Sequence, residues 1–380
     1  MKVFNGADRA DEIKKATKGA RIGFASGPAG VTKMLRPTLD VLLEIGKVTA
    51  LYGPEHGIRG DVTAGDPISE YTDSRTGLPV YSLYGEQYAP DARQLENIDI
   101  MVYDMQDIGC RFFTYLSTLK HIMDSCAREG KPVVVLDRVN PIGGISVEGN
   151  LQEEEFLSFV GVAPIAQRHG MTVGELAKLF NSEHNIGCQL TVIEVTGWER
   201  SAFFDQTDLF WVLPSPNIPT PDTALVYSGT CLFEGTNMSE GRGTTKPFEI
   251  IGAPWIDEIE YAKILNSLGL PGVIFRPTVF RPSTSKHEGG VCRGVELHIS
   301  DRLLFRPVET GLAMIDIARE EGKSNFKWLE PQGKDGRYFI DLLSGSGQLR
   351  TGSVSRATLY DAWLNETAQF LPIREKYLIY

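Results

Sequence analysis

The sequence predicts an α/β protein in which a doubly wound, mostly parallel sheet is followed by a second, smaller α+β C-terminal domain. Short apolar runs alternate with amphipathic helical patterns through about the first 200 residues, as they do in consecutive βαβ units. The runs at 98–104 and 132–137 are continuously hydrophobic, which is typical of strands covered on both faces. From about Pro254 the alternation stops, and two partly amphipathic strand patterns lie between helical ones.

The first domain is predicted to cover residues 1–253. Its expected strands are 21–25, 48–52, 79–83, 98–104, 132–137 and 189–195. Its expected helices are 37–46, a segment around 116–126 whose apolar residues recur at helical spacing, and 173–181. Gly130 and Pro132 end the second helix, and Thr172 with Glu175 forms a capping box at the start of the third.

The second domain is predicted to cover residues 254–380, joined to the first near Gly252. Helices are expected at 256–268, 307–321 and 355–366, and strands at 273–280 and 291–300. This order of elements indicates a smaller α+β unit rather than a continuation of the parallel sheet.

Charge and hydropathy exclude several classes of partner. The net charge of −11, from 38 Lys and Arg against 49 Asp and Glu, argues against broad capture of nucleic acid or an anionic membrane. No apolar run reaches the ~20 residues that a membrane-spanning helix needs, so no membrane insertion is expected. Residues 1–10 lack the apolar core of a signal peptide. The protein is expected to be cytoplasmic, or exported with its leader removed, and its oligomeric state is not predicted.

Motif spacing excludes further classes. The five cysteines contain no C-x-x-C pair, so zinc ribbons, thioredoxin-like sites and disulfide frameworks are not expected. The cysteines are expected to be buried or incidental thiols, and unpaired cysteines favour a reducing compartment. The absence of H-E-x-x-H, Walker A, G-x-S-x-G and G-x-G-x-x-G motifs excludes common metalloproteases, NTPases, α/β-hydrolases and dinucleotide-binding enzymes.

Polar residues directly follow three of the predicted strands. Glu55 and His56 come after strand 48–52 between closely spaced glycines, which predicts a tight loop lying against a ligand. The sets after strands 98–104 and 132–137 contain Gln106, Asp107, Arg111, Arg138 and Asn140. Ligands gather at the carboxyl ends of parallel strands, so these side chains are candidate site residues, with ordinary polar turns as the alternative.

A second candidate segment covers residues 233–248. It holds two carboxylates, Glu234 and Glu240, together with Arg242, Lys246 and three glycines. A glycine-rich loop presents backbone N–H groups and, with an arginine nearby, suits an anionic ligand. The proline-rich approach at 213–219 is rigid, which favours a site over the alternative of a mobile surface loop.

Five motifs in these segments carry a resemblance to a known family. They are Y-G-P-E-H-G-I-R-G at 52–60, Y-D-M-Q-D-I-G-C-R-F-F-T-Y at 103–115, L-D-R-V-N-P-I-G-G at 136–144, P-S-P-N-I-P at 214–219 and F-E-G-T-N-M-S-E-G-R-G-T-T-K-P-F-E at 233–249. Together they resemble the exo-β-N-acetylmuramidase family of NamZ type. The resemblance extends from about Arg21 to the C-terminus, and the combination of motifs is highly specific.

The resemblance implies a glycoside hydrolase that releases N-acetylmuramic acid from the non-reducing end of peptidoglycan glycan fragments, with muramyl saccharides as partners. It also implies a Rossmann-like catalytic domain, an auxiliary C-terminal domain and an active-site cleft between them, and no cofactor is expected. Two alternatives stay open. One is a non-catalytic muropeptide- or sugar-binding protein, and the other is a metal-dependent phosphatase or deacetylase using His56, Asp104 and Asp137.

Glycoside hydrolysis needs a carboxylic acid and usually a second carboxylate. Glu55 matches the glutamate of the family's P-E-H-G motif and is the expected acid, while His56 orients it or binds a sugar hydroxyl. The second carboxylate is expected among Asp104, Asp107, Glu234 and Glu240. Glu240 and Asp104 rank first, unless the substrate's own acetamido oxygen takes this role. Retention or inversion at the anomeric carbon is not predicted.

The lactyl carboxylate of N-acetylmuramic acid requires a local cation in a protein of this net charge. Arg242, Arg111 and Arg138 are the candidates, with Arg59 and Lys246 behind them. The residues expected to bind sugar hydroxyls are Asn140, Asn217, Asn237, Gln106 and Tyr115. Asp137 and Thr244 complete the expected substrate-binding set.

Overall fold

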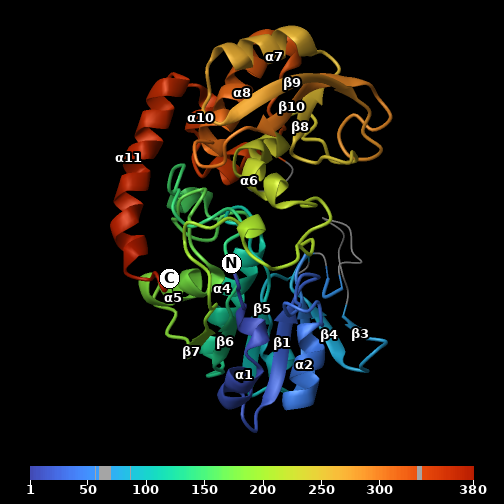
Figure 1. The fold of residues 1–380 in the computed structure, drawn as a ribbon, viewed down its shortest axis with the longest axis vertical. Coiled ribbons are helices and arrows are strands. Elements are labelled where there is room, and N and C mark those ends of the chain that lie inside the picture. Colours follow the sequence, from blue (N-terminus) through green and yellow to red (C-terminus); the bar gives the residue numbers. More distant parts are fainter. Residues whose placement is uncertain (56, 60–69, 86, 332–335) are drawn as a thin grey trace.

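The computed structural model describes residues 1–55, 57–59, 70–85, 87–331 and 336–380. These parts of the chain form two lobes, a lower one around a sheet of seven strands and an upper one around a sheet of three (Figure 1). The predicted fold class, a mostly parallel sheet followed by a smaller α+β unit, is therefore confirmed. His56, a predicted catalytic residue, lies outside the described residues.

The lower sheet is parallel except at one edge. Its order is β3-β4-β2-β1-β5-β6-β7, with β3 antiparallel to β4. The strands are β1 (Arg21–Ser26), β2 (Lys47–Gly53), β3 (Tyr71–Thr72), β4 (Pro79–Ser82), β5 (Ile100–Asp104), β6 (Val133–Leu136) and β7 (Leu190–Ile193). All six predicted strands are present within a few residues of their expected limits. The two-residue β3 is missing from the prediction because it has no apolar run.

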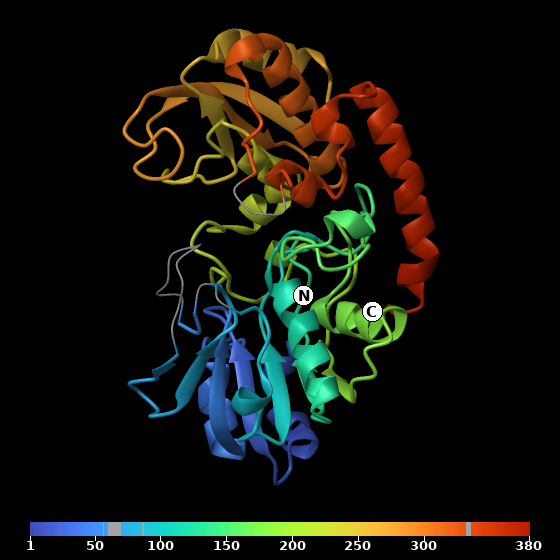
Figure 2. The ribbon, with the colours of Figure 1, turned by 180° about the vertical axis from the view of Figure 1, so that it is seen from behind.

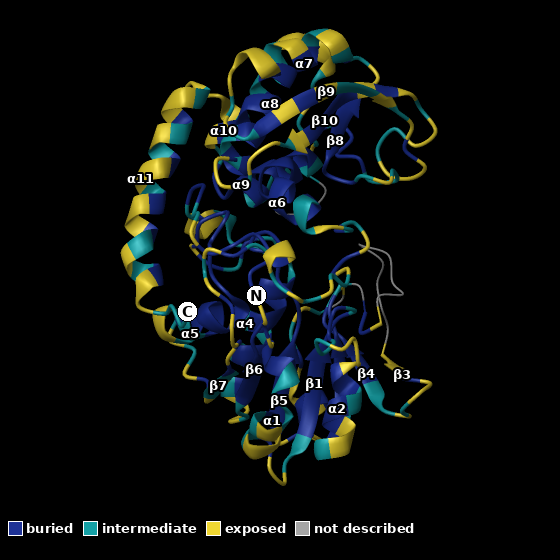
Figure 3. Ribbon diagram, viewed as in Figure 1, coloured by how far each residue is buried: buried dark blue, intermediate teal, exposed yellow. Residues whose placement is uncertain are grey.

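Helices cover both faces of this sheet. They are α1 (Ala10–Ala16), α2 (Thr38–Ile45), α3 (Ala92–Leu95), α4 (Tyr115–Arg128) and α5 (Val173–Glu183). In β5, Ile100 and Val102 pack in the same core as residues of α1 and α2, whereas Met101 and Tyr103 pack with α4 and α5. Accordingly α1 and α2 lie in front of the sheet in Figure 1, and α4 lies in front of it in Figure 2. Burial on both faces (Figure 3) explains why the strand is apolar without alternation.

The start of α5 is confirmed in detail. The backbone N–H of Glu175 donates to Thr172 Oγ1 (3.3 Å), and the backbone N–H of Thr172 donates to Glu175 Oε2 (2.9 Å). This reciprocal pair satisfies two N–H groups that the first turn of a helix leaves unpaired. The capping box therefore stabilises the first turn of α5.

The upper lobe contains the antiparallel sheet β8-β10-β9 and the helices packed on it. Its elements are α6 (Pro221–Thr230), β8 (Ile250–Ala253), α7 (Glu258–Ser267), β9 (Val273–Phe280), β10 (Cys292–Ile299), α8 (Pro307–Gly322), α9 (Phe339–Ser344), α10 (Gln348–Thr351) and α11 (Arg356–Glu375). Close packing of α6 on α8 depends on Gly229, where a Cβ would lie 1.9 Å from the carbonyl oxygen of Pro307. Strand β8 contains Gly252, near which the junction was expected, and pairs with β10. The limits 1–253 and 254–380 stay a prediction.

Helix α11 is longer than the predicted segment 355–366. It runs from the upper lobe along one side of the molecule down to α5 (Figures 1 and 2). Thr367 Oγ1 donates to the carbonyl of Gly149 (2.7 Å), and Arg374 Nη2 donates to the carbonyl of Gly170 (2.7 Å). These contacts with the lower lobe support the last turns, and the local periodicity of the sequence does not contain them.

Two further findings concern the cysteines and the apolar character of the helices. All five cysteines are buried free thiols, as predicted. No helix within the described ranges is long and apolar enough to cross a membrane.

Candidate active site

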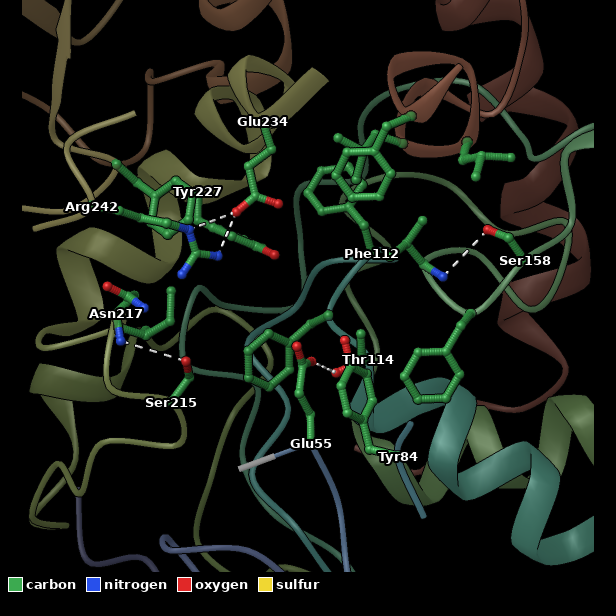
Figure 4. Close-up of a pocket in the computed structure, with 18 of the residues that line it drawn as sticks. Glu55, Tyr84, Phe112, Thr114, Ser158, Ser215, Asn217, Tyr227, Glu234 and Arg242 are labelled. Carbon is green, nitrogen blue, oxygen red and sulfur yellow. Dashed lines mark hydrogen bonds and ion pairs between the residues drawn. The ribbon is translucent and has the colours of Figure 1, made fainter. Parts of the chain in front are cut away.

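A cavity of about 280 Å³ is lined by residues of both lobes (Figure 4). The lower lobe contributes loops that follow β2, β4 and β5, and the upper lobe contributes α6, α9 and the segment around Arg242. The lining residues are Glu55, Tyr84, Tyr88, Phe112, Phe113, Thr114, Ser158, Phe159, Val160, Ser215, Asn217, Ile218, Tyr227, Glu234, Arg242, Phe248, Phe339, Leu342 and Leu343. Of the residues predicted from the sequence, the structure thus brings Glu55, Asn217, Glu234 and Arg242 together.

Glu55 enters the cavity from a tight turn at the carboxyl end of β2. The backbone N–H of Gly57 donates to the carbonyl of Pro54 (2.8 Å), and Gly57 has a φ of 71°, in the left-handed region that favours glycine. Thr114 Oγ1 donates to Glu55 Oε2 (2.9 Å). Burial, followed by the proximity of Glu55, raises the pKa of the Tyr84 hydroxyl well above its usual range. Glu55 is therefore held at a rigid strand end beside two hydroxyl groups.

Glu234 and Arg242 face the cavity from the upper lobe (Figure 4). Arg242 Nε donates to Glu234 Oε1 (2.9 Å), and Arg242 Nη2 bonds the same oxygen. Burial disfavours the charged guanidinium, but the carboxylates of Glu234 and Glu240 raise the pKa of Arg242 above its usual range. The guanidinium also lies over the Phe248 ring, 5.1 Å from its centroid. The cavity therefore holds a fixed cation.

Aromatic rings form much of the remaining wall. Tyr227 packs edge to face against Phe112 (5.6 Å between centroids) and against Phe248 (4.6 Å). Phe339 of α9 lines the same cavity, together with two leucines of that helix. Residues 112–114, F-F-T, are part of the second motif and could be found from the sequence. Helix α9 and Phe159 lie in no such motif. Sequence reasoning missed them because only the tertiary fold brings them to Glu55.

Asp104 and Arg138, two of the predicted site residues, lie outside the cavity lining. Asp104 Oδ1 and Oδ2 accept from Arg138 Nε (2.6 Å) and Nη2 (2.9 Å), and the aspartate is fully buried. Arg138 Nη2 also donates to the carbonyl of Val31 (2.8 Å). The pair binds the loops after β1, β5 and β6 together, so its arrangement is that of a structural ion pair.

Three other predicted residues stabilise the same loops. Gln106 Nε2 donates to the carbonyl of Val139 (3.0 Å), and Asp107 Oδ2 accepts from the backbone N–H of Gly109 (2.7 Å). Asn140 donates to a backbone carbonyl of the loop before α5 (3.0 Å). All three side chains are buried and none lines the cavity. They are at the expected sheet edge, but they face other loops.

Arg111 and Tyr115 connect segments around the cavity. Arg111 Nη1 donates to the carbonyl of Asn150 (2.7 Å), and Nη2 donates to the carbonyl of Ser344 at the end of α9 (3.0 Å). Burial lowers the pKa of Arg111 to about 9. The Tyr115 hydroxyl donates to the carbonyl of Pro214 (2.5 Å). Both side chains are fully buried, so they hold the walls of the cavity without lining it.

The remaining predicted residues of the upper lobe, Glu240, Asn237 and Thr244, also lie outside the lining. Glu240 is 1% exposed, with Oε1 3.4 Å from Arg242 Nε and Oε2 2.8 Å from Lys286 Nζ. Asn237 bonds backbone groups of the segment before α9, and Thr244 donates to a carbonyl in its own loop (2.6 Å). Glu240 therefore supports Arg242 from behind.

Asp137, predicted to bind substrate, instead caps α5 from the end of β6. It accepts from the backbone N–H of Gly174 (2.7 Å), Thr172 Oγ1 (2.7 Å) and the Tyr380 hydroxyl (2.7 Å). Burial, the largest influence, raises the pKa of Asp137 to about 6. Together with Asp104 it belonged to the alternative metal site, and both side chains are occupied by protein partners.

The raised pKa of Asp137 predicts a pH-dependent stability. Because the folded state binds this proton more tightly than the unfolded state, the contribution is complete below about pH 4 and is lost as the pH rises through 6. It amounts to about 3 kcal/mol in the free energy of unfolding. Urea unfolding of the wild type and of Asp137→Asn at pH 4 to 7 measures it. The difference between the two proteins is expected to change with pH, whereas Asp11→Asn at an exposed site leaves the profile unchanged. Parallel profiles for wild type and Asp137→Asn contradict the prediction.

Two family models together match most of the chain. Residues 22–222 match the model described as exo-beta-N-acetylmuramidase NamZ, N-terminal, and residues 225–380 match the corresponding C-terminal model. The chain is also similar to a peptidoglycan beta-N-acetylmuramidase NamZ of Bacillus subtilis (strain 168). The identity is 47% over 385 aligned residues, covering 100% of this chain and 92% of the relative.

Solved structures share the two-lobed fold. A DUF1343 family protein of Bacteroides fragilis NCTC 9343, whose crystal structure was determined at 1.65 Å resolution, superposes with a TM-score of 0.90 at 37% identity. A second protein of that family from the same organism, determined at 1.30 Å, gives a TM-score of 0.79 at 29% identity. Each comparison covers 100% of this chain and 99% of the other. Both lobes, which together line the cavity, therefore belong to a fold that these proteins share.

Proposed function

The chain belongs to the exo-beta-N-acetylmuramidase NamZ family and is a peptidoglycan-hydrolysing glycosidase, and we propose that it releases N-acetylmuramic acid from the non-reducing end of glycan fragments. One structural observation supports this specific activity in addition to the family membership. Glu55 and the Glu234–Arg242 pair line a single cavity of about 280 Å³. This arrangement combines carboxylates for hydrolysis with a cation for a carboxylated sugar. Membership of a glycosidase family sets aside the binding-protein and phosphatase or deacetylase alternatives.

Glu55 is the proposed general acid. Among the described residues it has no ion-pair partner, whereas Glu234 is bonded by Arg242. The departing glycosidic oxygen needs a proton, and Glu55 lies in the cavity with hydroxyl groups rather than a cation beside it. The hydrogen bond from Thr114 fixes one carboxyl oxygen, and the Tyr84 hydroxyl also interacts with this carboxylate.

Glu234 is the proposed second carboxylate, in place of Asp104 and Glu240. Among the described residues it is the other carboxylate that lines the cavity, and its bonds to Arg242 fix its orientation. We assign it the positioning of the attacking group, either water or the acetamido oxygen of the substrate. Asp104 is paired with the buried Arg138, and Glu240 is paired with Lys286 and Arg242. Neither carboxylate lines the cavity.

Arg242 is the proposed partner of the lactyl carboxylate. Its Nε and Nη2 bond Glu234, and no described residue accepts a hydrogen bond from Nη1. Asn217 lines the same side of the cavity (Figure 4) and offers an amide for a sugar hydroxyl. A sugar without the lactyl group lacks the anion that this guanidinium would bind.

The test compares the release of N-acetylmuramic acid from a muramyl β-glycoside with turnover of the N-acetylglucosamine analogue. In the wild type, kcat/KM is expected to favour the muramyl substrate. Arg242→Gln is expected to reduce this preference by about 10- to 100-fold, because a charge-assisted hydrogen bond is lost. Arg293→Gln, which breaks an exposed Arg–Glu pair, is the matched control. If Arg242→Gln lowers kcat/KM equally on both glycosides, Arg242 does not bind the lactyl carboxylate. If the wild type releases no N-acetylmuramic acid, the proposed function is wrong.

A further inference from the structure

Three aromatic side chains of the cavity lining, Tyr84, Tyr88 and Phe159, contact one another. We refer to them as the aromatic platform. The rings of Tyr88 and Phe159 are stacked with centroids 4.2 Å apart and planes at 30°. Tyr84 contacts both rings, at 5.7 Å from Phe159 and 5.9 Å from Tyr88. Phe159 comes from a segment about 70 residues away along the chain, so tertiary structure assembles the platform.

The platform is not part of the hydrophobic cores of the described residues. Tyr88 is 42% exposed, which is unusual for a stacked aromatic ring that packs no core. Phe159 is nevertheless fixed in place. It lies in a tight turn closed by reciprocal backbone bonds between Ser158 and Gly161, and its carbonyl accepts from Ser117 Oγ (2.7 Å). A rigid, partly exposed aromatic surface on a cavity is a surface prepared for a ligand.

The side of Phe159 away from Tyr88 is also supported. His121 of α4 lies parallel to the Phe159 ring, with 6.2 Å between centroids and 2° between planes. Burial lowers the pKa of His121, so near neutral pH it supports the ring as an uncharged imidazole. The lining residues from these segments, 84, 88 and 158–160, include no Arg or Lys, so the platform suits an uncharged ligand.

Tyr84 connects the platform to the proposed acid. Its hydroxyl lies near the Glu55 carboxylate, and both lie on one side of the cavity, with Glu234 and Arg242 on the far side (Figure 4). A general acid protonates the oxygen between two sugars and therefore lies at the boundary between their binding sites. The Arg242 side suits the sugar with a carboxylate. The platform then faces the sugar that leaves.

We propose that the aromatic platform binds the leaving sugar, an uncharged hexosamine, through stacking of its apolar face on the exposed ring of Tyr88, which Phe159 supports from the other side. This inference rests on the proposed function and identifies a second subsite for the same reaction. A β-linked pyranose with equatorial substituents has axial C–H groups on its faces, which complement the electron-rich face of an aromatic ring. The platform stabilises the leaving sugar next to Glu55, and Arg242 selects the muramyl group from which that sugar leaves.

The test uses two muramyl substrates that differ only in the leaving group. One is the disaccharide of N-acetylmuramic acid β-linked to N-acetylglucosamine, and the other is the β-glycosyl fluoride, whose leaving group is a single atom. Phe159→Ala and Tyr88→Ala are each expected to lower kcat/KM on the disaccharide by about tenfold or more. On the fluoride, both variants are expected to stay within about twofold of the wild type. Free N-acetylglucosamine is expected to inhibit the wild type more strongly than either variant.

Conservative variants and a remote control separate stacking from folding. Tyr88→Phe and Phe159→Tyr keep a ring and are expected to behave as the wild type does on both substrates. Phe210→Ala removes an exposed ring outside this cavity and is expected to change neither rate. Thermal unfolding of each variant confirms that it is folded at the assay temperature.

The outcomes show separately whether the aromatic platform or the proposed function is wrong. If a platform variant loses kcat/KM equally on the disaccharide and the fluoride, or loses none on either, the proposed role of the platform is wrong. The proposed hydrolase function is not affected by that result. A wild type that cleaves neither substrate overturns the proposed function. In that case the binding of free N-acetylglucosamine to the wild type and to Phe159→Ala, measured by saturation-transfer NMR, still decides the platform. Binding that is the same in both proteins refutes it.

Discussion

Glu55→Gln is expected to lower kcat on a muramyl disaccharide by about a thousandfold while leaving the protein folded. Glutamine has the same shape, and its amide oxygen accepts the bond that Thr114 donates to Glu55 Oε2. It carries no proton that it can transfer to the departing sugar. The loss is expected to be much smaller on a 2,4-dinitrophenyl muramyl glycoside, since that phenolate leaves without protonation. Steady-state kinetics on the two substrates measure the difference.

The pair of substrates identifies the role of Glu55 as well as its importance. A nucleophile or general base would be needed for both leaving groups, so equal losses would contradict the assignment as general acid. Near-normal turnover of the disaccharide by folded Glu55→Gln would remove Glu55 from the mechanism altogether. Glu96→Gln, at an exposed position of the lower lobe, is the matched control and is expected to keep full activity.

Asp104→Asn is expected to lower the free energy of unfolding by about 3–5 kcal/mol, because it leaves the buried guanidinium of Arg138 without its carboxylate. Urea unfolding at neutral pH measures the loss. Asp99→Asn breaks a bidentate pair with Arg21 of similar geometry whose side chains are about 40% exposed, and it is expected to cost at most about 1 kcal/mol. The contrast isolates burial as the cause.

The same variant tests the sequence-based ranking of Asp104 as a catalytic carboxylate. If Asp104 is structural, the folded fraction of Asp104→Asn keeps a kcat near that of the wild type at low temperature. The double variant Asp104→Leu with Arg138→Met is expected to recover most of the lost stability, since it removes both charges together. A large fall in kcat without a change in the free energy of unfolding would instead support Asp104 as a catalytic carboxylate.

Much of the fold follows from local patterns. The six predicted strands and the capping box of Thr172 and Glu175 are present, because strand runs and helix caps depend on residues only a few positions apart. Helix α11 extends beyond its predicted end because Thr367 and Arg374 bond carbonyls of the lower lobe. That support comes from residues about 200 positions away, and no local pattern contains it.

The candidate site divides in the same way. Glu55 and Asp104 both stand at the carboxyl ends of strands, and the sequence predicts that both lie at one edge of the sheet. Their neighbours differ. Glu55 meets Thr114 at the cavity, whereas Asp104 is enclosed with Arg138. A strand end determines where a side chain starts, and the loops that pack on it determine whether it reaches a ligand or a buried partner.

The sequence by itself determined the class of fold, the edge of the sheet where polar groups gather, and the motifs that carry Glu55, Glu234 and Arg242. Only the tertiary structure decided which carboxylates share the cavity, and only it brought Phe159 and α9 to Glu55. The physical reason is range. Backbone propensity, capping and turn chemistry act over a few residues and are visible in the sequence, whereas burial and charge pairing depend on chain segments that meet only after folding.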